Sequence, residues 1–185
     1  MGLIHYQLEA IHPFLDGNGR IGRLLITLLL CSWDVLPLPL LYLSAYFEAH
    51  RQNYYDLLLN VSQKGAWEAW LVFFLRGVTS QSLDAVNRIQ RLQSLREQYR
   101  ARFQAARAAS RLLQAVDILF TRPVFTVRQL GDGLGVNFST AQRYINQLVE
   151  AGIVHEITGQ ARNRVYVAGE ILRKIDEPVG YQAEG

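Results

Sequence analysis

The amino-acid sequence predicts a mainly α-helical chain, in which a helical N-terminal part is followed by a small α+β domain. Over most of the 185 residues, apolar side chains recur at three- and four-residue steps, as they do on one face of an α-helix. In the last third, two short β-branched runs flank a turn that contains glycine, which is typical of a β-hairpin. Half of the residues are hydrophobic, which is enough for a sizeable core.

The first two predicted helices are separated by a short polar loop. Residues Gly2–Ile11 carry apolar side chains at helical spacing. We expect this helix to stop at His12, because Pro13 disfavours the α conformation of the residue before it. A second, buried helix is predicted over Gly19–Trp33, and the two prolines of Leu36–Pro39 break it.

Further helical segments are predicted before the C-terminal domain. Ser44 is expected to cap a helix that runs to about Val61, and Gly65 is expected to end this segment. Large apolar residues predict a core helix over Trp67–Val78. Residues Ser80–Ser110 are predicted to form one or two long, exposed helices.

Residues 88–111 combine a narrow apolar stripe with seven arginines and a single acid, Glu97. A narrow stripe is typical of a connecting helix or of a contact between two copies of the chain, so a homodimer is one interpretation. The arginines indicate either a solvated face or a basic surface for nucleic acid or an acidic partner. The stripe consists of Ile89, Leu92, Leu95, Tyr99 and Phe103.

The C-terminal part predicts helices, an extended segment and a hairpin. Thr126 is placed to cap a helix over Val127–Leu134, and either Asn137 or Ser139 can cap the next helix. The full predicted order is a helix Arg111–Phe120, an extended segment Val124–Val127, a helix Val127–Leu134, a helix ending near Ala151, and strands Ile153–Ile157 and Arg164–Val167 with a turn at Gly159.

Composition limits the compartment and the partners. Cys31 is the single cysteine, so the chain cannot form an intrachain disulfide, which fits a reducing cytoplasm. We expect a cytoplasmic protein without a membrane partner, because there is no stretch of 18 apolar residues and no signal peptide pattern. The net charge is +3, and 17 of the 19 basic residues are arginine, which favours contacts with phosphate and carboxylate groups.

Residues His12–Arg23, with the sequence HPFLDGNGRIGR, contain the densest group of polar and glycine residues. Gly17, Asn18 and Gly19 all tolerate positive φ angles, so several backbone N–H groups can turn toward one anion. The helix begins at this point, and its free N–H groups and its dipole both favour phosphate. The sequence therefore predicts a phosphate site here.

Four side chains of this stretch suit the chemistry of a bound polyphosphate. Arg20 and Arg23 share a face of the first helical turn, where positive charges oppose the helix dipole and destabilise the helix. Two residues that are unfavourable for the local structure indicate a function. Asp16 is a suitable ligand for Mg²⁺, which binds through one or two carboxylates and phosphate oxygens. His12 is the titratable group beside the phosphates and could act as a general base.

The same stretch resembles the signature of Fic-domain proteins, H-x-F-x-[D/E]-G-N-G-R-x-x-R, at all eight defined positions. The family is known for AMPylation, the transfer of AMP from ATP to a hydroxyl side chain of a target protein. The resemblance implies that His12 deprotonates the target hydroxyl and that Asp16 holds Mg²⁺ against the α- and β-phosphates. It also implies that Arg23 binds the outer phosphates and that Phe14 anchors the loop in the core. The implied anion hole consists of Gly17, Asn18, Gly19 and Arg20.

Other positions refine the resemblance. Relatives that phosphorylate their targets often carry lysine where this chain has Gly19, so the glycine favours AMP transfer. Fic relatives contact the base or ribose with a pair of tyrosines, which makes Tyr54 and Tyr55 candidates, although both could instead serve packing. We expect residues 1–79 to be the C-terminal part of a Fic-type helical bundle in an N-terminally truncated protein.

The C-terminal sequence FSTAQRYINQLVEAGIV resembles the third helix and first wing strand of winged helix-turn-helix domains, which several Fic proteins carry. The resemblance implies such a domain over residues 111–175, after a connecting helical region 80–110 and before a tail 176–185. In duplex DNA the third helix would enter the major groove and the wing would touch phosphate. Protein contact or dimerisation is the alternative use of this fold. The polar residues available are Ser139, Thr140, Gln142, Arg143 and Asn146, with Arg162 and Arg164 on the wing.

The sequence thus predicts a protein adenylyltransferase that uses ATP and Mg²⁺ to modify a Ser, Thr or Tyr of a target protein. Two alternatives stay open. One is a DNA-binding transcriptional regulator whose Fic portion senses nucleotide or is vestigial. The other is an enzyme that removes AMP. The sequence predicts neither the target nor whether this shortened chain is active.

Overall fold

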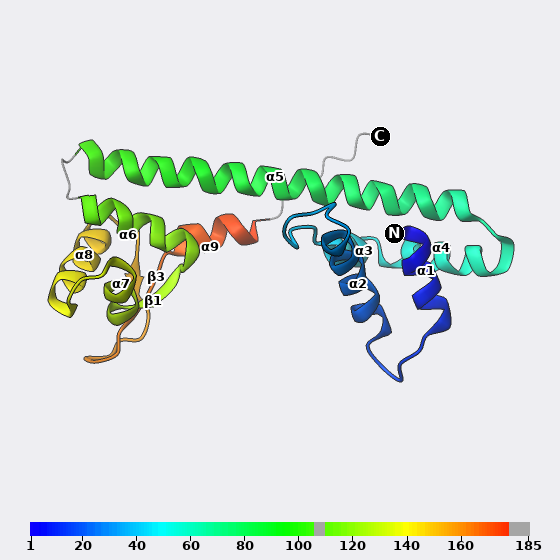
Figure 1. Cartoon of the computed structure of the whole chain (residues 1–185), viewed down its shortest axis with the longest axis horizontal. Helices are drawn as coiled ribbons and strands as arrows, with labels where there is room; N and C mark the ends of the chain where they lie inside the picture. The colour runs from blue at the N-terminus through cyan, green and yellow to red at the C-terminus, as the bar shows by residue number, and fades with distance from the viewer. Residues whose placement is uncertain (106–109, 178–185) are drawn as a thin grey trace. The chain divides into compact units, whose positions relative to one another are not determined.

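The structure is a computed structural model that describes residues 1–105 and 110–177 (Figure 1). The described residues form two compact units, 1–86 and 87–177, each with a hydrophobic core of its own. Helices dominate, and the described strands form one three-stranded sheet, which confirms the mainly α class. None of the described helices is both long enough and apolar enough to cross a membrane.

The first unit is entirely helical. Its helices are α1 (Gly2–Ile11), α2 (Asn18–Ser32), α3 (Leu43–Ala49), α4 (Arg51–Lys64) and the N-terminal part of α5 (Trp67–Ala105). Gly65 ends α4 in the left-handed conformation with φ 64°, as its sequence position predicts. The predicted bounds of α1 and α2 are confirmed to within one residue.

Aromatic side chains fill the core of the first unit. Trp70 on α5 is fully buried, and its indole Nε1 donates a hydrogen bond to the Gly2 carbonyl oxygen at 3.0 Å. This bond ties the start of α1 to α5. The buried cluster joins α2, α3, α4 and α5 and consists of Ile26, Leu41, Leu43, Tyr46, Phe47, Tyr54, Val61, Trp70, Phe73 and Phe74.

The single helix predicted from Ser44 to Val61 is wrong. Two helices, α3 and α4, occupy this segment, and α3 already begins at Leu43, so Ser44 is not its cap. The helix is interrupted at His50, which has φ −117° and ψ 34°. His50 Nδ1 donates to the Tyr46 carbonyl oxygen at 2.9 Å, so a side chain supplements the backbone bonding at the break.

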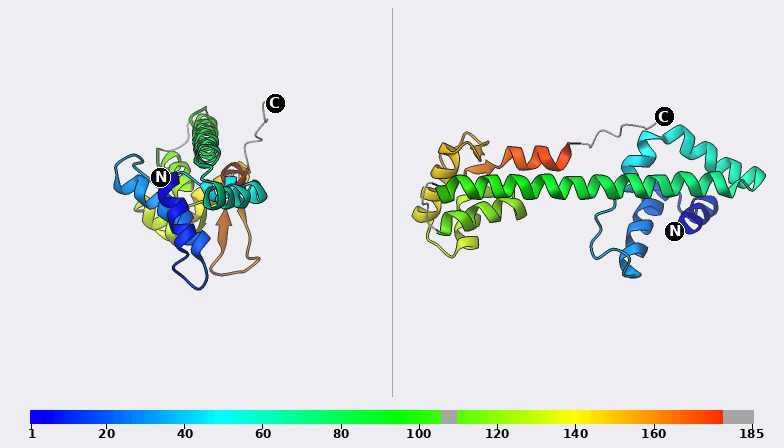
Figure 2. Two further views of the ribbon diagram at one scale, coloured as in Figure 1. Left: turned by 90° about the vertical axis from the view of Figure 1, so that its right-hand side faces the viewer. Right: turned by 90° about the horizontal axis from the view of Figure 1, so that it is seen from above.

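The predicted end of a helix near Val78 is also wrong. Helix α5 runs without interruption from Trp67 to Ala105 (Figure 2). The sequence between Val78 and Ser110 contains no glycine or proline that would stop a helix.

The second unit combines helices with a small sheet. After the C-terminal part of α5 come α6 (Ser110–Thr121), β1 (Val124–Thr126), α7 (Val127–Leu134), α8 (Phe138–Glu150), β2 (His155–Glu156), β3 (Val165–Val167) and α9 (Gly169–Asp176). The Thr126 hydroxyl accepts a hydrogen bond from the Gln129 N–H, which confirms its predicted cap. Of the two residues predicted to cap α8, Asn137 does so, because its Oδ1 accepts from the Thr140 N–H at 2.9 Å.

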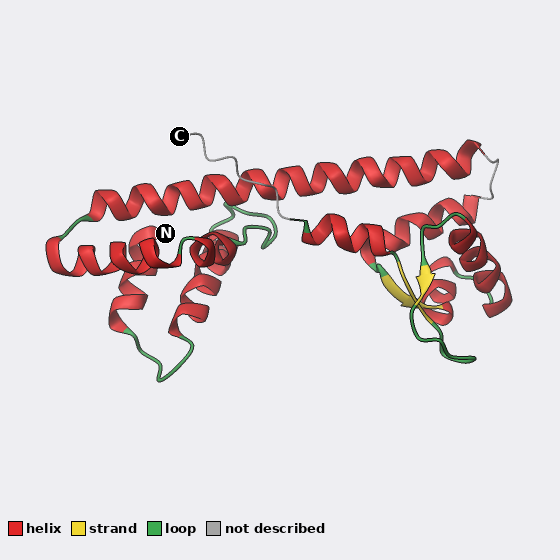
Figure 3. Ribbon diagram, turned by 180° about the vertical axis from the view of Figure 1, so that it is seen from behind, coloured by secondary structure: helices red, strands yellow, loops and turns green. Residues whose placement is uncertain are grey.

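The sheet has the strand order β1-β3-β2, and both pairs are antiparallel. The β2–β3 pair confirms the predicted hairpin, with His155 opposite Val167 and Gly159 turning at φ 63°. Strand β1 joins the same sheet through β3, with Val124 opposite Val167. Figure 3 shows the long loop between β2 and β3 extending from the sheet.

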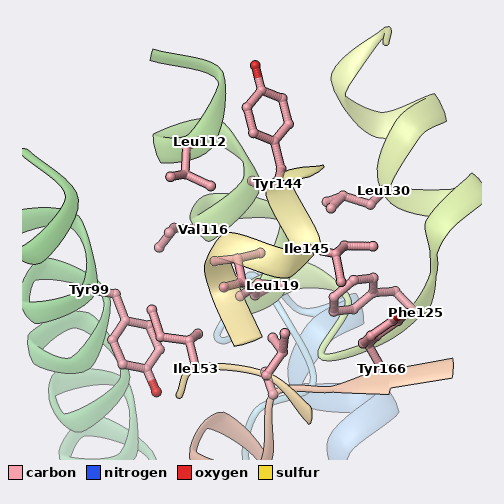
Figure 4. Close-up of a cluster of buried hydrophobic side chains, with 14 of the residues drawn as sticks. Tyr99, Leu112, Val116, Leu119, Phe125, Leu130, Tyr144, Ile145, Ile153 and Tyr166 are labelled. Atoms are coloured by element: carbon pink, nitrogen blue, oxygen red, sulfur yellow. The ribbon is translucent and has the colours of Figure 1, made fainter. Parts of the chain in front are cut away.

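The apolar stripe of α5 packs within its own chain. Leu95, Tyr99 and Phe103 are buried in the core of the second unit, and Leu92 packs against that core. Tyr99 also donates its hydroxyl proton to Glu170 Oε2 on α9 at 2.7 Å. Figure 4 shows the Tyr99 ring extending from α5 toward Ile153 and the α6 side chain Leu119. The C-terminal part of α5 therefore closes this core.

Most arginines of residues 88–111 bond within the same unit. Arg96 and Arg100 both donate to the Asp117 carboxylate on α6, at 2.7 and 2.5 Å. Partial burial opposes ionisation of Asp117, but the two arginines prevail and lower its pKa. Arg102 donates to the Ala151 carbonyl oxygen at 2.9 Å, and Arg91 pairs with Glu177. Arg107 lies outside the described residues.

Helix α9 was not predicted. It occupies Gly169–Asp176, between the last predicted strand and the predicted tail 176–185, of which residues 178–185 lie outside the described part. Its side chain Ile171 is fully buried in the core of the second unit.

The packing of α5 gives a stability prediction. Leu95→Ala should lower the free energy of unfolding of the second unit by about 2–5 kcal/mol, because Leu95 is only 4% exposed in a packed core. Leu83→Ala is a matched control on the same helix, since Leu83 is 57% exposed, and it should change stability by about 0.5 kcal/mol or less. Hydrogen exchange of the α6 and α8 amides measures both effects. Equal effects would contradict this packing.

Candidate functional site

The loop His12–Gly17 joins α1 to α2 and projects from the ends of the two helices (Figure 3). His12 ends α1 in the left-handed conformation, with φ 50° and ψ 56°. This confirms the predicted helix end and satisfies Pro13, since a residue before proline avoids the right-handed α region. Gly17, with φ 83°, is the N-cap of α2. A residue other than glycine would be strained there.

The Asn18 side chain holds the loop in place through two hydrogen bonds to its backbone. Asn18 is buried, although it is polar and is the first residue of α2. Its Oδ1 accepts a hydrogen bond from the Phe14 N–H at 2.9 Å, and its Nδ2 donates to the Phe14 carbonyl oxygen at 2.6 Å. Both ends of the carboxamide thus bond one backbone residue of the loop, which fixes the path from Phe14 to α2.

The N-terminus of α2 lies open beside two charged side chains. The first N–H groups of an α-helix lack intrahelical acceptors, and no side chain caps them in α2, because its N-cap is a glycine. Asp16 accepts from the Gly17 N–H at 2.6 Å and from Arg20 Nη2 at 3.1 Å. Asp16 and Arg20 are both exposed, as is His12.

Arg23 lies against the same helix end. A Cβ atom on Gly19 would lie 3.2 Å from Arg23 Nη1 and 3.9 Å from Glu9 Oε1, so both charged groups approach the backbone at this glycine. A Cβ atom on Gly22 would overlap with Glu9 Oε1. The two glycines on α2 therefore leave space for a carboxylate from α1 beside the guanidinium of Arg23.

A buried histidine, His5, lies on α1 one turn before Glu9. His5 Nε2 bonds the Tyr54 hydroxyl at 2.9 Å, and its ring stacks on Phe47 and Trp70 with centroids 5.5 and 6.0 Å apart. Burial lowers the pKa of His5 to about 4. Burial also raises the pKa of Tyr54, and the charge of Glu9 raises it further. His5 is thus a structural side chain of the core.

The structure contradicts the expected anchoring role of Phe14 and places the two candidate tyrosines in different environments. Phe14 is 47% exposed and does not anchor the loop in the core, because the Asn18 side chain holds the loop through its backbone instead. The two tyrosines face different ways, as neighbours on a helix must. Tyr54 is 3% exposed and bonds His5, whereas Tyr55 is 51% exposed and lies beside Arg51.

The second unit contains a groove of about 850 Å³ between α7, α8 and the β2–β3 loop. It brings together four of the residues predicted to contact DNA, whereas Ser139, Thr140 and Arg143 lie outside its lining. Arg143 is exposed with its guanidinium 5.5 Å from the Tyr144 ring. The described lining contains no carboxylate and consists of Thr126, Val127, Arg128, Phe138, Gln142, Asn146, Ala161, Arg162, Asn163 and Arg164.

Comparison with known proteins concerns the first unit. Residues 1–30 match the family model described as Fic/DOC family. The matched residues include α1, the His12–Gly17 loop and most of α2, which are the elements that form the open helix end.

The chain is also similar to proteins named protein adenylyltransferase Fic. The one from Aedes aegypti is 38% identical over 82 residues, which are 44% of this chain and 15% of the relative. The one from Nematostella vectensis is 35% identical over 83 residues, 45% of this chain and 18% of the relative. The one from Drosophila yakuba is 34% identical over 82 residues, 44% of this chain and 15% of the relative. The chain thus matches less than a fifth of the length of these relatives.

Sequence reasoning missed Glu9 and Gly22. Two signals were available. Glu9 lies three residues before His12 on one helix, so the two side chains share a face. Gly22 lies inside a helix, where glycine is unfavourable unless a neighbour approaches closely.

The buried His5 predicts a pH dependence. Because the pKa of His5 is about 4 in the folded chain, against an ordinary value of 6.5, the unfolded chain binds more protons between these two values. The free energy of unfolding should therefore fall by about 3 kcal/mol as pH falls from 6.5 to 4. Burial raises the pKa of Glu9, which acts in the opposite direction and offsets part of this loss.

Urea unfolding at pH 7 and pH 4.5 tests this, with tryptophan fluorescence as the probe, since Trp33, Trp67 and Trp70 all lie in the first unit. His5→Gln should reduce the difference between the two pH values. His155→Gln, at an exposed position of the second unit, is the control and should leave the difference unchanged. An unaltered pH dependence in His5→Gln would contradict the prediction.

Proposed function

We propose that the first unit carries the catalytic loop of a protein adenylyltransferase, which transfers AMP from ATP to a Ser, Thr or Tyr hydroxyl of a target protein. The observation that carries this proposal is the open N-terminus of α2, where Gly17 turns at φ 83° and no side chain caps the helix. The match of residues 1–30 to the Fic/DOC family supports it.

The helix end suits a triphosphate. Backbone N–H groups and the helix dipole attract anions at such a terminus, and glycine lets a phosphate approach the backbone closely. Residues Gly17, Asn18, Gly19 and Arg20 would surround the α- and β-phosphates. Arg23, whose guanidinium lies over Gly19, would bind the outer phosphates. Arginine suits this role because its planar group binds phosphate through two hydrogen bonds.

His12 would act as the general base. Its side chain is exposed at the end of α1, where the loop to the open helix end begins, so a target hydroxyl could reach it. As the hydroxyl oxygen attacks the α-phosphorus of ATP, its proton passes to His12. The bond from the α-phosphorus to the bridging oxygen breaks, and pyrophosphate leaves with the electron pair. Positioning and charge stabilisation would supply the rest of the rate enhancement.

Asp16 would hold Mg²⁺. The described residues contain no group of three or more His, Cys, Asp or Glu that could bind a metal alone, so most ligands would be phosphate oxygens and water. An exposed carboxylate beside the phosphate site fits that mode of binding, because Mg²⁺ keeps several waters. The ion would neutralise phosphate charge. Tyr55 remains our candidate for contact with the base or ribose, whereas Tyr54 supports the loop from the core.

Two variants test the assignment. Arg20→Ala should abolish the rise in melting temperature that Mg-ATP gives the wild type, because a ligand stabilises the fold only as far as it binds. His12→Ala should keep that rise but lower transfer of labelled AMP to protein by about 10²–10⁴-fold, the usual contribution of a general base.

Arg76→Ala is a matched control, since Arg76 is an exposed arginine of the first unit, lies on α5 and has no assigned role in the site. It should leave both readouts unchanged. Undiminished transfer by His12→Ala would refute the assigned base, and a wild type unaffected by Mg-ATP would refute the phosphate site.

A specific observation favours a second function, the binding of duplex DNA by the second unit as a winged helix-turn-helix domain. Gln142 and Asn146 on α8 line one groove with Arg162 and Arg164 from the β2–β3 loop, and no described lining residue is acidic. We propose that α8 enters the major groove while the loop arginines contact phosphate. On this interpretation the first unit would serve a DNA-binding regulator as a nucleotide sensor.

The salt dependence of DNA binding separates these roles. Arg162→Ala should weaken binding to all sequences and reduce the slope of log K against log salt by about 1, the value for one phosphate contact. Gln142→Ala should instead leave the slope unchanged and weaken binding to a specific site. Arg173→Ala on α9, outside the groove lining, is the control. Absence of binding at low salt would contradict this second function.

A further inference from the structure

We propose that Glu9 is a positioning residue, whose negative charge keeps the guanidinium of Arg23 near the start of α2. The inference rests on the proposed function, in which Arg23 binds the outer phosphates of ATP. Glu9 itself would not touch the nucleotide; it would act through Arg23.

The approach of α1 to α2 at Gly22 places the Glu9 carboxylate. Gly22 is buried inside α2, and a Cβ atom at this position would overlap with Glu9 Oε1 and lie 3.1 Å from His5 Cε1. Glycine weakens a helix interior, so a glycine here indicates that a neighbour needs the space. The nearest neighbour is the end of the Glu9 side chain, and the His5 ring lies next to it.

One oxygen of the Glu9 carboxylate is buried without a hydrogen-bond partner. The Glu9 side chain is 13% exposed, and its Oε1 has no hydrogen-bond partner among the described residues. A buried carboxylate is costly unless a nearby positive charge compensates it. Arg23 provides this charge at longer range. Arg23 Nη1 and Glu9 Oε1 both approach the backbone at Gly19. The charge of Arg23 acts more strongly on Glu9 than that of His12. The two groups do not form one of the ion pairs within 4.0 Å that the described residues contain.

The other groups around Glu9 are poorer partners. His5 Nε2 lies 4.0 Å from Glu9 Oε1, but burial holds the pKa of His5 near 4, so this ring is neutral at pH 7. The Tyr54 hydroxyl bonds His5. His12 contributes positive charge when protonated, but its effect on Glu9 is smaller than that of Arg23. Burial raises the pKa of Glu9, and the charge of Arg23 acts most strongly against that rise.

Restraint of Arg23 would matter because a long arginine side chain loses rotamer freedom when it binds phosphate. A carboxylate that holds the guanidinium in place beforehand removes most of that cost. Glu9→Gln keeps the size of the side chain but removes its charge. It should weaken Mg-ATP binding by about three- to tenfold, the cost of ordering one such side chain.

The experiment measures Mg-ATP affinity by calorimetry at pH 8 and the Arg23 Nε–Hε NMR signal without ligand. A restrained guanidinium gives a dispersed signal that exchanges slowly with water. Glu9→Gln should lose this signal and bind Mg-ATP more weakly. Glu68→Gln, a carboxylate variant at an exposed position on α5 of the same unit, is the control and should change neither readout.

The outcomes separate this inference from the proposed function. If the wild type binds Mg-ATP, then equal or tighter binding by Glu9→Gln, or an unchanged Arg23 signal, overturns the role of Glu9 and leaves the proposed function standing. If the wild type does not bind Mg-ATP, the proposed function fails. The Arg23 signal then decides alone, since its loss in Glu9→Gln supports the restraint and its persistence overturns it.

A second variant displaces the carboxylate without removing it. The Cβ atom of Gly22→Ala occupies the space of Glu9 Oε1. This variant should reproduce the loss of the Arg23 signal while its helix content remains unchanged. In a Glu9→Ala background the same substitution should have no further effect on that signal. A restrained Arg23 in Gly22→Ala overturns the proposal.

Discussion

The geometry of the open helix end depends on two hydrogen bonds from one buried carboxamide. Asn18 bonds the Phe14 N–H and the Phe14 carbonyl oxygen, at 2.9 and 2.6 Å, and so closes the loop on itself. Because of these two hydrogen bonds, the chain between Phe14 and Asn18 must turn sharply. Gly17 supplies the positive φ that the turn requires. A loop held by its backbone leaves the side chains of His12, Asp16 and Arg20 to face solvent.

Helix α1 connects the charged loop to the aromatic core of the first unit. His5 is neutral and buried among Phe47, Trp70 and Tyr54, so this side chain fixes α1 by stacking and by its hydrogen bond to Tyr54. The bond from Trp70 to the Gly2 carbonyl oxygen fixes the start of the same helix. One turn further along α1, Glu9 reaches the space that Gly22 leaves open. The polarity of α1 thus rises along its length, from the ring stack at His5 to the exposed imidazole of His12.

Short-range rules predicted much of this structure. The caps at Thr126 and Asn137, the end of α1 at His12 and the left-handed glycines at 17, 65 and 159 all follow from neighbouring residues. The break at His50 was not predicted. The continuity of α5 was missed although the sequence between Val78 and Ser110 contains no glycine or proline. Helix α9 did not follow from short-range rules, because its Ile171 is held by packing with residues far apart in the sequence. Glu9 was missed for the same reason, since its burial requires contact with α2. The motif from His12 to Arg23 was recognisable because its residues are neighbours in sequence as well as in space.

The arginines show why charge in a sequence does not by itself predict a binding surface. Residues 88–111 have the densest basic run, yet Arg96 and Arg100 direct their charge to one carboxylate, Asp117, and Arg102 bonds a backbone carbonyl. Arg162 and Arg164 lie in a less basic stretch but line a groove with no described acidic residue. Whether an arginine can attract an external phosphate therefore depends on the nearest carboxylate of the folded chain. Arg23 lies between these two cases. The Glu9 carboxylate is close to its guanidinium but does not form an ion pair with it, so on our proposal it can direct the guanidinium without neutralising its charge.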